Sequence, residues 1–201
     1  MHLELLVEES SAEAALHALI PKIAPGVTFA VRVFKGKPDL LRKLSDRLRG
    51  YAEWLPQDFG IVVLTDEDRR DCRKLKGQLE EAAWAAGMGT KSRSRSNRFQ
   101  VLNRIAVEEL EAWFFGDPDA VRAAYPRVPD GFEHKAAYRN PDGIAGGTAE
   151  ALERLLQRAG YYRGGLQKID TARAISRHMD PERNTSHSFC VFRDGLRAML
   201  A

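Results

Sequence analysis

Acidic residues follow a short apolar run in the first half of the chain. The apolar residues 61–64 (IVVL) lead through Thr65 into an acidic tripeptide at 66–68 (DED). Consecutive apolar residues bounded by polar ones are typical of a strand buried on both faces, as in a parallel sheet. In an extended chain Asp66 and Asp68 would point to the same side. Two carboxylates at a strand tip suit a divalent cation such as Mg²⁺ or Mn²⁺, which prefers oxygen ligands.

Further carboxylates fall at the ends of other predicted strands. Glu8 ends the first strand, residues 2–7 (HLELLV), while Glu109 and Glu111 follow the fourth. The structural alternative, for these residues and for the tripeptide at 66–68, is an acidic turn or helix start in solvent. The functional interpretation gains weight only if the carboxylates converge on one place.

The elements that would position these acids alternate between strand and helix. Strands are predicted at residues 2–7, 27–34 and 59–64 and within 99–107. A capping box at Ser10 and Glu13 would begin the first helix, and further helices are predicted at 40–55 and from about Arg69 to Ala86. This alternation predicts an α/β fold, with a parallel sheet of about four strands and helices on both faces.

The order of the strands would bring the acids together. Crossovers between parallel strands are nearly always right-handed. The compact solution therefore places the second strand on one side of the first strand and the third strand on the other. The gap between the first and third strands is then a topological switch point, where open α/β sheets bind ligands. Glu8 and Asp66 should face each other across this crevice.

Several carboxylates gathered in this way could not all stay ionised without a counter-charge. Like charges about 4 Å apart repel by roughly 4 kcal/mol at an effective dielectric constant near 20. Either several pKa values rise, or a divalent cation lies among the carboxylates. Carboxylate sites that hold two metal ions serve phosphodiester chemistry. The sequence therefore predicts Mg²⁺ or Mn²⁺ as a cofactor.

The composition is that of an ordinary globular protein, with 44% hydrophobic and 29% charged residues. No apolar run approaches the roughly 18 residues of a membrane span. Glu4, Glu8 and Glu9 lie near the N-terminus, with no preceding basic segment, and this pattern does not fit a signal peptide. Cys72 and Cys190 are isolated, which argues against a zinc site or a disulfide scaffold. We expect a cytoplasmic protein with no membrane partner.

Positive charge is concentrated in one predicted loop. The net charge of +3 is too small to indicate nucleic acid by itself, but no acid occurs between Met88 and Val107. The candidate phosphate contacts in this loop are Lys91, Arg93, Arg95 and Arg98. The alternative is a loop whose charges are simply solvated.

The second half of the chain is predicted to be a helical extension. Helical segments at 148–159, 170–178 and 189–200 follow a stretch at 125–147 that is rich in Pro, Gly and Asn. We therefore predict an α/β core at residues 1–115 and a helical extension packed on it at residues 116–201.

These motifs resemble the Toprim domain, which topoisomerases, bacterial primases and overcoming-lysogenization-defect (OLD) nucleases share. The residues that carry the resemblance are Glu8 after the first strand, Gly36 after the second and the tripeptide at 66–68 after the third. Residues 109–114 (ELEAWF) are similar to the acidic and aromatic helix start of the OLD-type branch.

Over nearly its whole length the chain also resembles a bacterial family, domain-of-unknown-function family 4276. The supporting stretches are residues 6–11, residues 109–113, and a tail that contains Lys168 and residues 188–189. OLD-type domains usually carry glycine after the first glutamate. Glu9 stands there in this chain, where it would add a ligand or change the geometry.

The resemblance implies a Toprim fold and metal-dependent cleavage of nucleic acid, with DNA favoured over RNA. It also implies an association with an ATPase partner in phage defence. It makes Glu8 a metal-bridging or general-base carboxylate and Asp66 and Asp68 metal ligands. Glu111, and then Glu109, are candidates for a second metal ion. Lys168 would neutralise a phosphate or a leaving oxygen, and its alternative is an ordinary surface lysine.

Two other functions remain open. Phosphatases of the haloacid dehalogenase type also use an aspartate pair at a strand end, but a small residue and Thr or Val usually follow it. Here Arg69 and Arg70 follow. Alternatively the acidic residues are degenerate, and the chain is a non-catalytic binding subunit of an ATPase complex. Release of phosphate from small phosphomonoesters would favour the first function, and failure to bind Mg²⁺ or Mn²⁺ the second.

Overall fold

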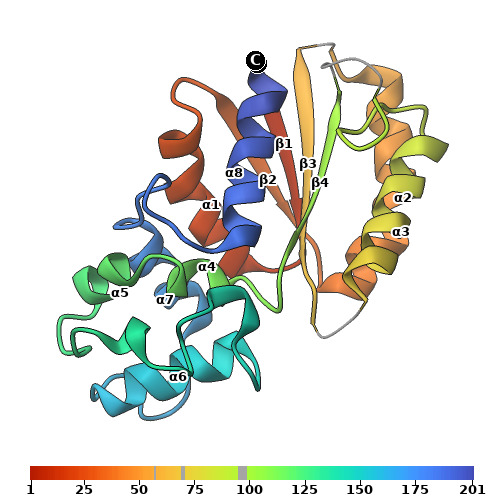
Figure 1. Cartoon of the computed structure of the whole chain (residues 1–201). Helices are drawn as coiled ribbons and strands as arrows, with labels where there is room; N and C mark the ends of the chain where they lie inside the picture. The colour runs from red at the N-terminus through yellow and green to blue at the C-terminus, as the bar shows by residue number, and fades with distance from the viewer. Residues whose placement is uncertain (57, 69–70, 95–98) are drawn as a thin grey trace.

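A single parallel sheet forms the centre of the molecule. The computed structural model describes residues 1–56, 58–68, 71–94 and 99–201. The four strands are β1 (His2–Val7), β2 (Thr28–Val33), β3 (Phe59–Asp66) and β4 (Val101–Ala106). They are all parallel and lie in the order β2-β1-β3-β4 (Figure 1). The predicted α/β class, the strand order and the switch point between β1 and β3 are therefore confirmed.

Helices cover both faces of this sheet. The helices α1 (Ser10–Ile23) and α8 (His187–Leu200) lie on one face, and α2 (Lys37–Trp54) and α3 (Cys72–Ala85) lie on the other (Figure 1). The strand side chains alternate between two hydrophobic clusters, because successive residues point to opposite faces. Leu5 and Val62 pack on the α1 side, and Leu6 and Val63 pack on the α2 side.

The remaining helices gather beside the carboxyl ends of the strands, at the lower left of Figure 1. They are α4 (Glu111–Phe115), α5 (Pro118–Ala124), α6 (Thr148–Arg158) and α7 (Lys168–Ser176), with short 3-10 turns at Phe132–His134 and Pro141–Gly143. Trp113 of α4 joins this group to α8, since its ring lies 5.3 Å from that of Phe189 and its indole N–H donates to Ser188 at 3.0 Å. One hydrophobic cluster runs through α1, β1, α4, α6 and α8, and the division at residue 115 stays a prediction.

The predicted capping box at the start of α1 is wrong. The helix begins at Ser10, so that Glu9 occupies the cap position with an extended backbone and no side-chain cap bond. Glu9 instead accepts a hydrogen bond from the hydroxyl of Ser11. The carboxylate of Glu9 therefore stays at the carboxyl edge of the sheet and does not close the first turn.

The helix after β3 also begins later than predicted, at Cys72. Its cap is Asp71, whose carboxylate accepts from the backbone N–H groups of Arg73 at 2.9 Å and Lys74 at 3.1 Å. An aspartate cap satisfies two of the backbone donors that a helix start leaves free. Asp68 is therefore not the cap of this helix. The strand before it is longer than predicted and ends at Asp66.

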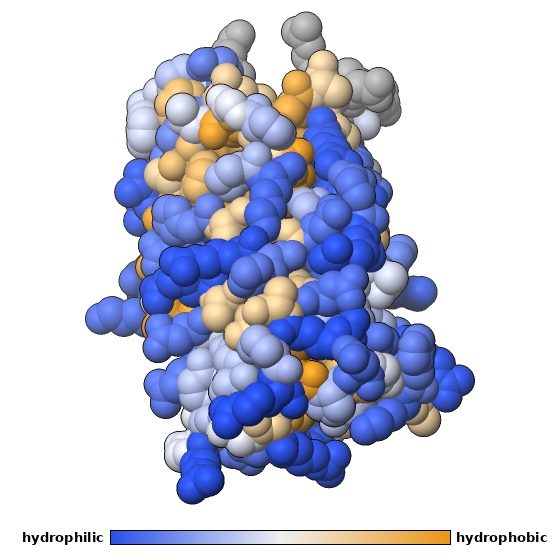
Figure 2. Space-filling model, turned by 90° about the vertical axis from the view of Figure 1, so that its left-hand side faces the viewer, coloured by the Kyte–Doolittle hydropathy of each residue, from blue (hydrophilic) through white to orange (hydrophobic). Residues whose placement is uncertain are grey.

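The face of the molecule that bears α1 is mainly hydrophilic, with small hydrophobic patches (Figure 2). No helix in the described part of the chain is long and apolar enough to cross a membrane.

Candidate functional site

Glu8 lies at the point where β1 meets β3. Val7 is level with Leu64 across the two strands, so Glu8 falls beside Thr65. Its carboxylate accepts hydrogen bonds from the Thr65 hydroxyl and from the Asp66 backbone N–H, each at 3.0 Å. Burial raises the pKa of Glu8, although these two donors and Lys37 act in the opposite direction. The prediction that Glu8 and Asp66 meet at the switch point is confirmed.

Asp66 is the last residue of β3, and it is buried. Burial raises the pKa of its carboxyl well above the usual value, and the neighbouring carboxylates of Glu8 and Glu111 raise it further. A buried carboxylate that faces other carboxylates favours either a proton or a cation.

Glu111 is the most deeply buried of the predicted ligands. It is the first residue of α4 and only 1% exposed. Its Oε2 atom is buried and has no hydrogen-bond partner among the described residues. The one other buried side-chain atom there without a partner is Asn103 Oδ1. Burial raises the pKa of Glu111 to about 7, against the effect of Lys168. A buried oxygen without a partner is costly, and a bound cation would relieve that cost.

Lys168 begins α7 and is half-buried near these acids. Burial alone would lower the pKa of its ammonium group, but the carboxylates of Glu111 and Glu9 raise that pKa above its usual value. The half-buried ammonium group of Lys168 therefore lies within reach of the charges at the acidic edge. Glu9, which also raises the pKa of Asp66 and Glu111, belongs to the same group of charges.

The prediction that Asp66 and Asp68 lie in one extended segment is wrong at Asp68, although its charge still acts on Asp66 and Glu8. The φ of 51° at Asp68 is left-handed, so the chain is no longer extended there and the alternation of strand side chains does not apply. The side chain of Asp68 is 50% exposed, and its Oδ2 lies 2.6 Å from the ammonium of Lys37. Asp68 therefore serves as the partner of a buried lysine.

Glu109 also has a structural task. Its Oε2 accepts hydrogen bonds from the Thr148 hydroxyl at 3.1 Å and from the backbone N–H of Ala149 at 2.8 Å. It thereby caps the start of α6, whose own preceding residue, Gly147, offers no side-chain cap. The two glutamates therefore differ in role. Glu109 caps a helix, whereas the carboxylate of Glu111 raises the pKa of Asp66.

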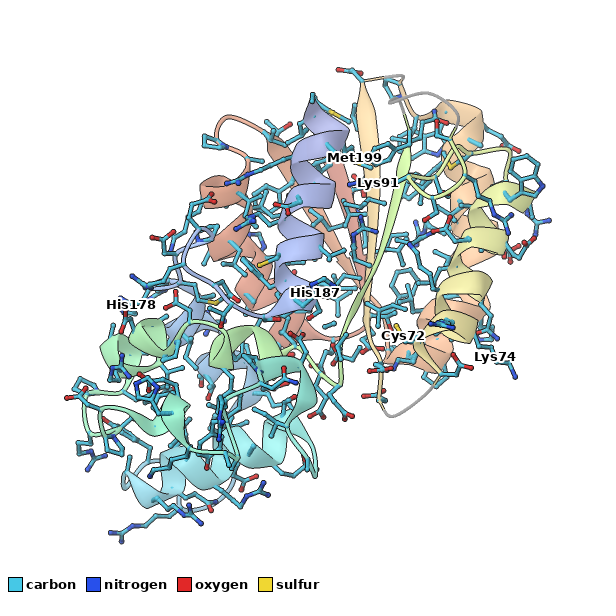
Figure 3. The ribbon with its side chains drawn as sticks, in the orientation of Figure 1. Cys72, Lys74, Lys91, His178, His187 and Met199 are labelled. Carbon is cyan, nitrogen blue, oxygen red and sulfur yellow. The ribbon has the colours of Figure 1, made fainter. Side chains whose placement is uncertain are left out.

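The basic loop lies far from the acidic residues. It leads into Val101, which pairs with Ile61 near the start of β3, whereas Glu8 and Asp66 lie where their strands end. Since β4 has six residues, the two edges are about 20 Å apart. In Figure 3, Lys91 lies toward the opposite end of the sheet from Cys72, which begins α3.

Within this loop, Arg93 pairs with Glu81 and lies 5.8 Å from the centre of the Trp84 ring. Arg95 and Arg98 fall outside the described residues. Phosphate binding by the four basic residues stays a prediction, and the two that are described would contact nucleic acid at the amino edge of the sheet.

Other buried acids of the chain have polar partners. Glu4, in the middle of β1, accepts from Arg32 at 2.9 Å and from the Tyr51 hydroxyl at 3.0 Å. Burial would raise the pKa of Glu4, but these hydrogen bonds lower it below its usual value. Glu80 has the same balance, with Lys76 as its main partner. At Glu8, Asp66 and Glu111, by contrast, the effect of burial is not outweighed, and the pKa values are raised.

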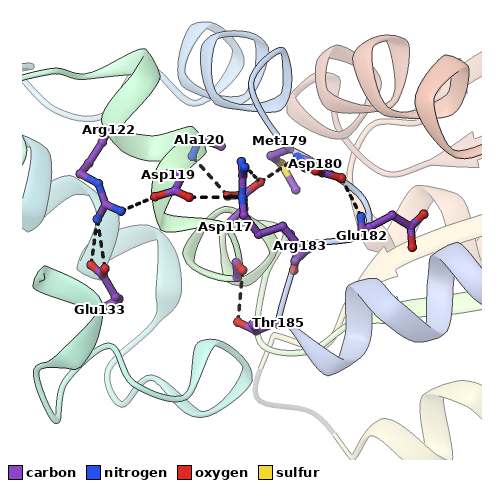
Figure 4. Close-up of polar contacts among 12 residues, drawn as sticks. Asp117, Asp119, Ala120, Arg122, Glu133, Met179, Asp180, Glu182, Arg183 and Thr185 are labelled. Carbon is purple, nitrogen blue, oxygen red and sulfur yellow. Dashed lines mark hydrogen bonds and ion pairs between the residues drawn. The ribbon is translucent and has the colours of Figure 1, made fainter. Parts of the chain in front are cut away.

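Asp117 is a further buried acid with complete pairing (Figure 4). It accepts from both Nε and Nη2 of Arg183, at 2.8 and 3.0 Å, and from the backbone N–H of Asp180 at 2.8 Å. It also caps α5 through the N–H of Ala120. This network ties α5 to the segment after α7 and so helps to hold the helical group beside the acidic edge.

The donor chemistry at this edge fits Mg²⁺ or Mn²⁺, because the available groups are carboxylates and one of them has an unpartnered oxygen. The geometry is less complete. Within the described residues, no three acidic, histidine or cysteine side chains lie close enough together to hold a metal ion. Binding would require Glu8, Asp66 and Glu111 to draw closer.

The chain is similar to one known protein family over most of its length. The model described as Domain of unknown function (DUF4276) matches residues 7–197. The chain belongs to this family. No curated protein and no solved structure matches the chain. The acidic edge of this DUF4276 chain, with Glu8, Asp66, Glu111 and Lys168, lies wholly within the matched residues.

Sequence reasoning missed one residue at this edge of the DUF4276 chain. Lys37 is 4% exposed, and its charge acts on Glu8 as well as on Asp68. The only signal for it is its place in a Gly-Lys-Pro turn after β2, at the same edge as the acids. Gly36 allows this turn, since its φ is 81°.

The pairing of Lys37 with Asp68 leads to a prediction. Asp68→Asn should lower the free energy of unfolding by about 2 kcal/mol, because it leaves a buried ammonium group without its closest partner. Urea unfolding measures the change. The matched control is Asp46→Asn, which removes an exposed pair with Arg49 and should cost about 0.5 kcal/mol or less. Equal effects of the two substitutions would show that Lys37 does not depend on Asp68.

Proposed function

We propose that this protein is a divalent-metal-dependent nuclease that cleaves phosphodiester bonds in nucleic acid. The observation that carries the proposal is the group of buried carboxylates at the carboxyl edge of β1 and β3, where Glu111 keeps an unpartnered oxygen. The raised pKa values of Glu8, Asp66 and Glu111 support it, because burial, and at Asp66 also the neighbouring carboxylates, disfavours the ionised form that a bound cation would stabilise.

Each residue at the acidic edge would have a role that follows from its position. Asp66, Glu111 and Glu8 would supply oxygen ligands to Mg²⁺ or Mn²⁺. Such an ion, when bound, stabilises negative charge on a phosphate and lowers the pKa of water. Lys168 would neutralise a phosphate oxygen beside Glu111. At neutral pH the carboxyl of Glu111, with a pKa of about 7, is partly protonated and would release that proton before it binds a cation.

Several finer assignments belong to the same proposal. The order of the acids along the strands supports a Toprim arrangement of the OLD type. Such an arrangement would favour DNA as the substrate and an ATPase partner in phage defence. We keep Glu8, Asp66, Glu111 and Lys168 in their proposed roles. Asp68 and Glu109 would join a ligand set only by leaving Lys37 and the start of α6.

A second candidate function is a non-catalytic binding subunit. It is favoured by the lack, within the described residues, of three side chains close enough to hold an ion. On that interpretation the acidic edge would take no metal, and Lys37 and Lys168 would balance its charge.

Calorimetry separates the two functions. We expect the wild type to bind Mn²⁺ and Mg²⁺ weakly, with dissociation constants on the order of millimolar or below, and to be stabilised as the metal concentration rises. Glu111→Gln should remove both effects. The matched control, Glu109→Gln, should retain both metal binding and stabilisation by metal, because Glu109 is engaged at the start of α6 and is not one of the proposed ligands. In parallel, the same proteins are incubated with supercoiled plasmid and Mn²⁺. Absence of heat and of thermal shift at millimolar metal would favour the binding subunit.

A further inference from the structure

A groove between α1 and α7 opens beside the acidic edge. It encloses about 600 Å³, within the range of about 300–1,000 Å³ that accommodates a small molecule the size of a nucleotide. Ala14 and Ala18 of α1 and Ile169 of α7 give it apolar walls. Ile169 is 43% exposed, so part of its apolar surface is open to a ligand.

Positive charge lines the same groove. Arg173 lies in the last turn of α7, Arg177 directly follows that helix, and both side chains are exposed. Arg173 pairs with Asp170 at 2.9 Å, and Asp170 is itself exposed. Glu13 is the acidic lining residue, from α1. The arginines on one wall therefore favour an anionic ligand, and the exposed pair with Asp170 is weak enough to exchange for a phosphate.

The groove also offers a ring for stacking. His17 lines it, and its imidazole packs against Phe29 in a tilted arrangement, with the ring centres 5.3 Å apart. Unpaired bases commonly stack on histidine rings, while neighbouring arginines contact the phosphates.

Both walls of the groove lead to the acidic edge. Ser10, at the start of α1, lines the groove and follows Glu8 and Glu9 directly in the chain. Ile169 follows Lys168 directly. A chain of phosphates that lay in the groove would therefore pass next to Glu8 and Lys168.

The groove is held in shape without a ligand. Lys22, in the last turn of α1, donates to the backbone carbonyls of Arg177 at 2.6 Å and Met179 at 2.8 Å. These bonds fasten the far end of α1 to the end of α7. Because the two walls are already joined, little conformational entropy would be lost on binding.

We infer that this groove binds the phosphodiester backbone of single-stranded nucleic acid and leads it to the acidic edge. Arg173 and Arg177 would contact phosphates, and His17 and Ile169 would contact a base. Contact of these two side chains with a base requires the strand to be unpaired there, because the bases of a duplex are stacked and paired with one another. The inference rests on the proposed nuclease function, because leading a strand to the acidic edge matters only if the strand is cleaved there. Binding of the strand in the groove needs neither metal nor cleavage.

The test is therefore made in EDTA, because chelation of divalent metal prevents metal-dependent cleavage and leaves binding to be measured alone. Fluorescein-labelled dT15 and rU15 are titrated with the full chain at several salt concentrations, and anisotropy is recorded. The test variant is Arg173→Gln/Arg177→Gln. The control is Arg42→Gln/Arg49→Gln, which removes the same charge from exposed positions on α2, across the sheet. A third variant, Lys91→Gln/Arg93→Gln, examines the basic loop.

We expect the wild type to bind at least one oligonucleotide. The groove variant should reduce the slope of log K against log salt by about 1.4, which corresponds to two lost contacts on a single strand, and should weaken binding about tenfold at low salt. The α2 control should keep the wild-type slope. The inference is overturned if neither oligonucleotide binds, if the groove variant behaves like the α2 control, or if only the loop variant loses affinity. Groove-dependent binding without cleavage in Mn²⁺ would leave the inference standing and remove the proposed nuclease.

Discussion

Asp66→Asn is expected to abolish metal-dependent cleavage and, at the same time, to raise the melting temperature of the metal-free protein. The substitution keeps the shape of the side chain and removes a charge that burial and the neighbouring Glu8 and Glu111 oppose. We expect a gain of about 1–2 kcal/mol in the free energy of unfolding at pH 7.5 in chelator, because the folded protein no longer has to bury a carboxyl group, ionised or protonated, beside Glu8 and Glu111. Melting curves with EDTA and with Mn²⁺ measure both effects.

The control for this prediction is Glu4→Gln. Glu4 is also a buried acid of the sheet, but Arg32 and Tyr51 pair with it. Its neutralisation should destabilise the protein, because it leaves donors facing a neutral amide, and should not change the response to Mn²⁺. If Asp66→Asn were destabilising in EDTA and responded to Mn²⁺ like the wild type, Asp66 would be a structural residue and not a ligand.

The second large effect is a loss of stability with rising pH. The pKa of Glu111 is about 7 in the folded protein, against an ordinary value of 4.5. The folded state thus binds this proton more tightly than the unfolded state does. The resulting stabilisation is fully present below pH 4.5 and is lost as the pH rises through 7. The shift corresponds to about 3 kcal/mol. We therefore expect the metal-free protein to melt at lower temperatures from pH 5 to pH 8.

Glu111→Gln isolates this contribution. The variant should show a flatter decline between pH 5 and pH 8 than the wild type, because only the titration of Glu8 and Asp66 remains to act in that direction. In the wild type, Mn²⁺ should restore stability most strongly at the alkaline end, where the carboxylate is free to bind. Parallel declines for the wild type and the variant would mean that Glu111 keeps an ordinary pKa in the folded protein.

Much of the fold follows from signals that are local in the sequence. The apolar runs that lead to Glu8 and Asp66 predict strands, and right-handed crossovers then leave one compact order for the sheet. This order is observed, and it alone brings Glu8 within hydrogen-bond distance of the Asp66 backbone. The part of the site that rests on strand ends was therefore predictable.

The errors arise where the backbone leaves regular geometry or where a distant segment uses a side chain. A left-handed φ at Asp68 has no signature in the acidic tripeptide, and it sends that carboxylate to Lys37. Glu109 caps α6, which begins some 40 residues later in the chain. The groove depends on the packing of α1 against α7, which no local pattern indicates.

The most direct test of the central claim is a crystal structure of the protein with bound Mn²⁺, examined by anomalous scattering. The proposed metal site requires a peak within about 2.0–2.6 Å of carboxylate oxygens of Asp66 and Glu111, with Glu8 close by. Asp68 should remain with Lys37, and Glu109 should remain at the start of α6. An anomalous peak elsewhere, or none at the acidic edge while Glu111 Oε2 stays without a partner, would contradict the proposed metal site.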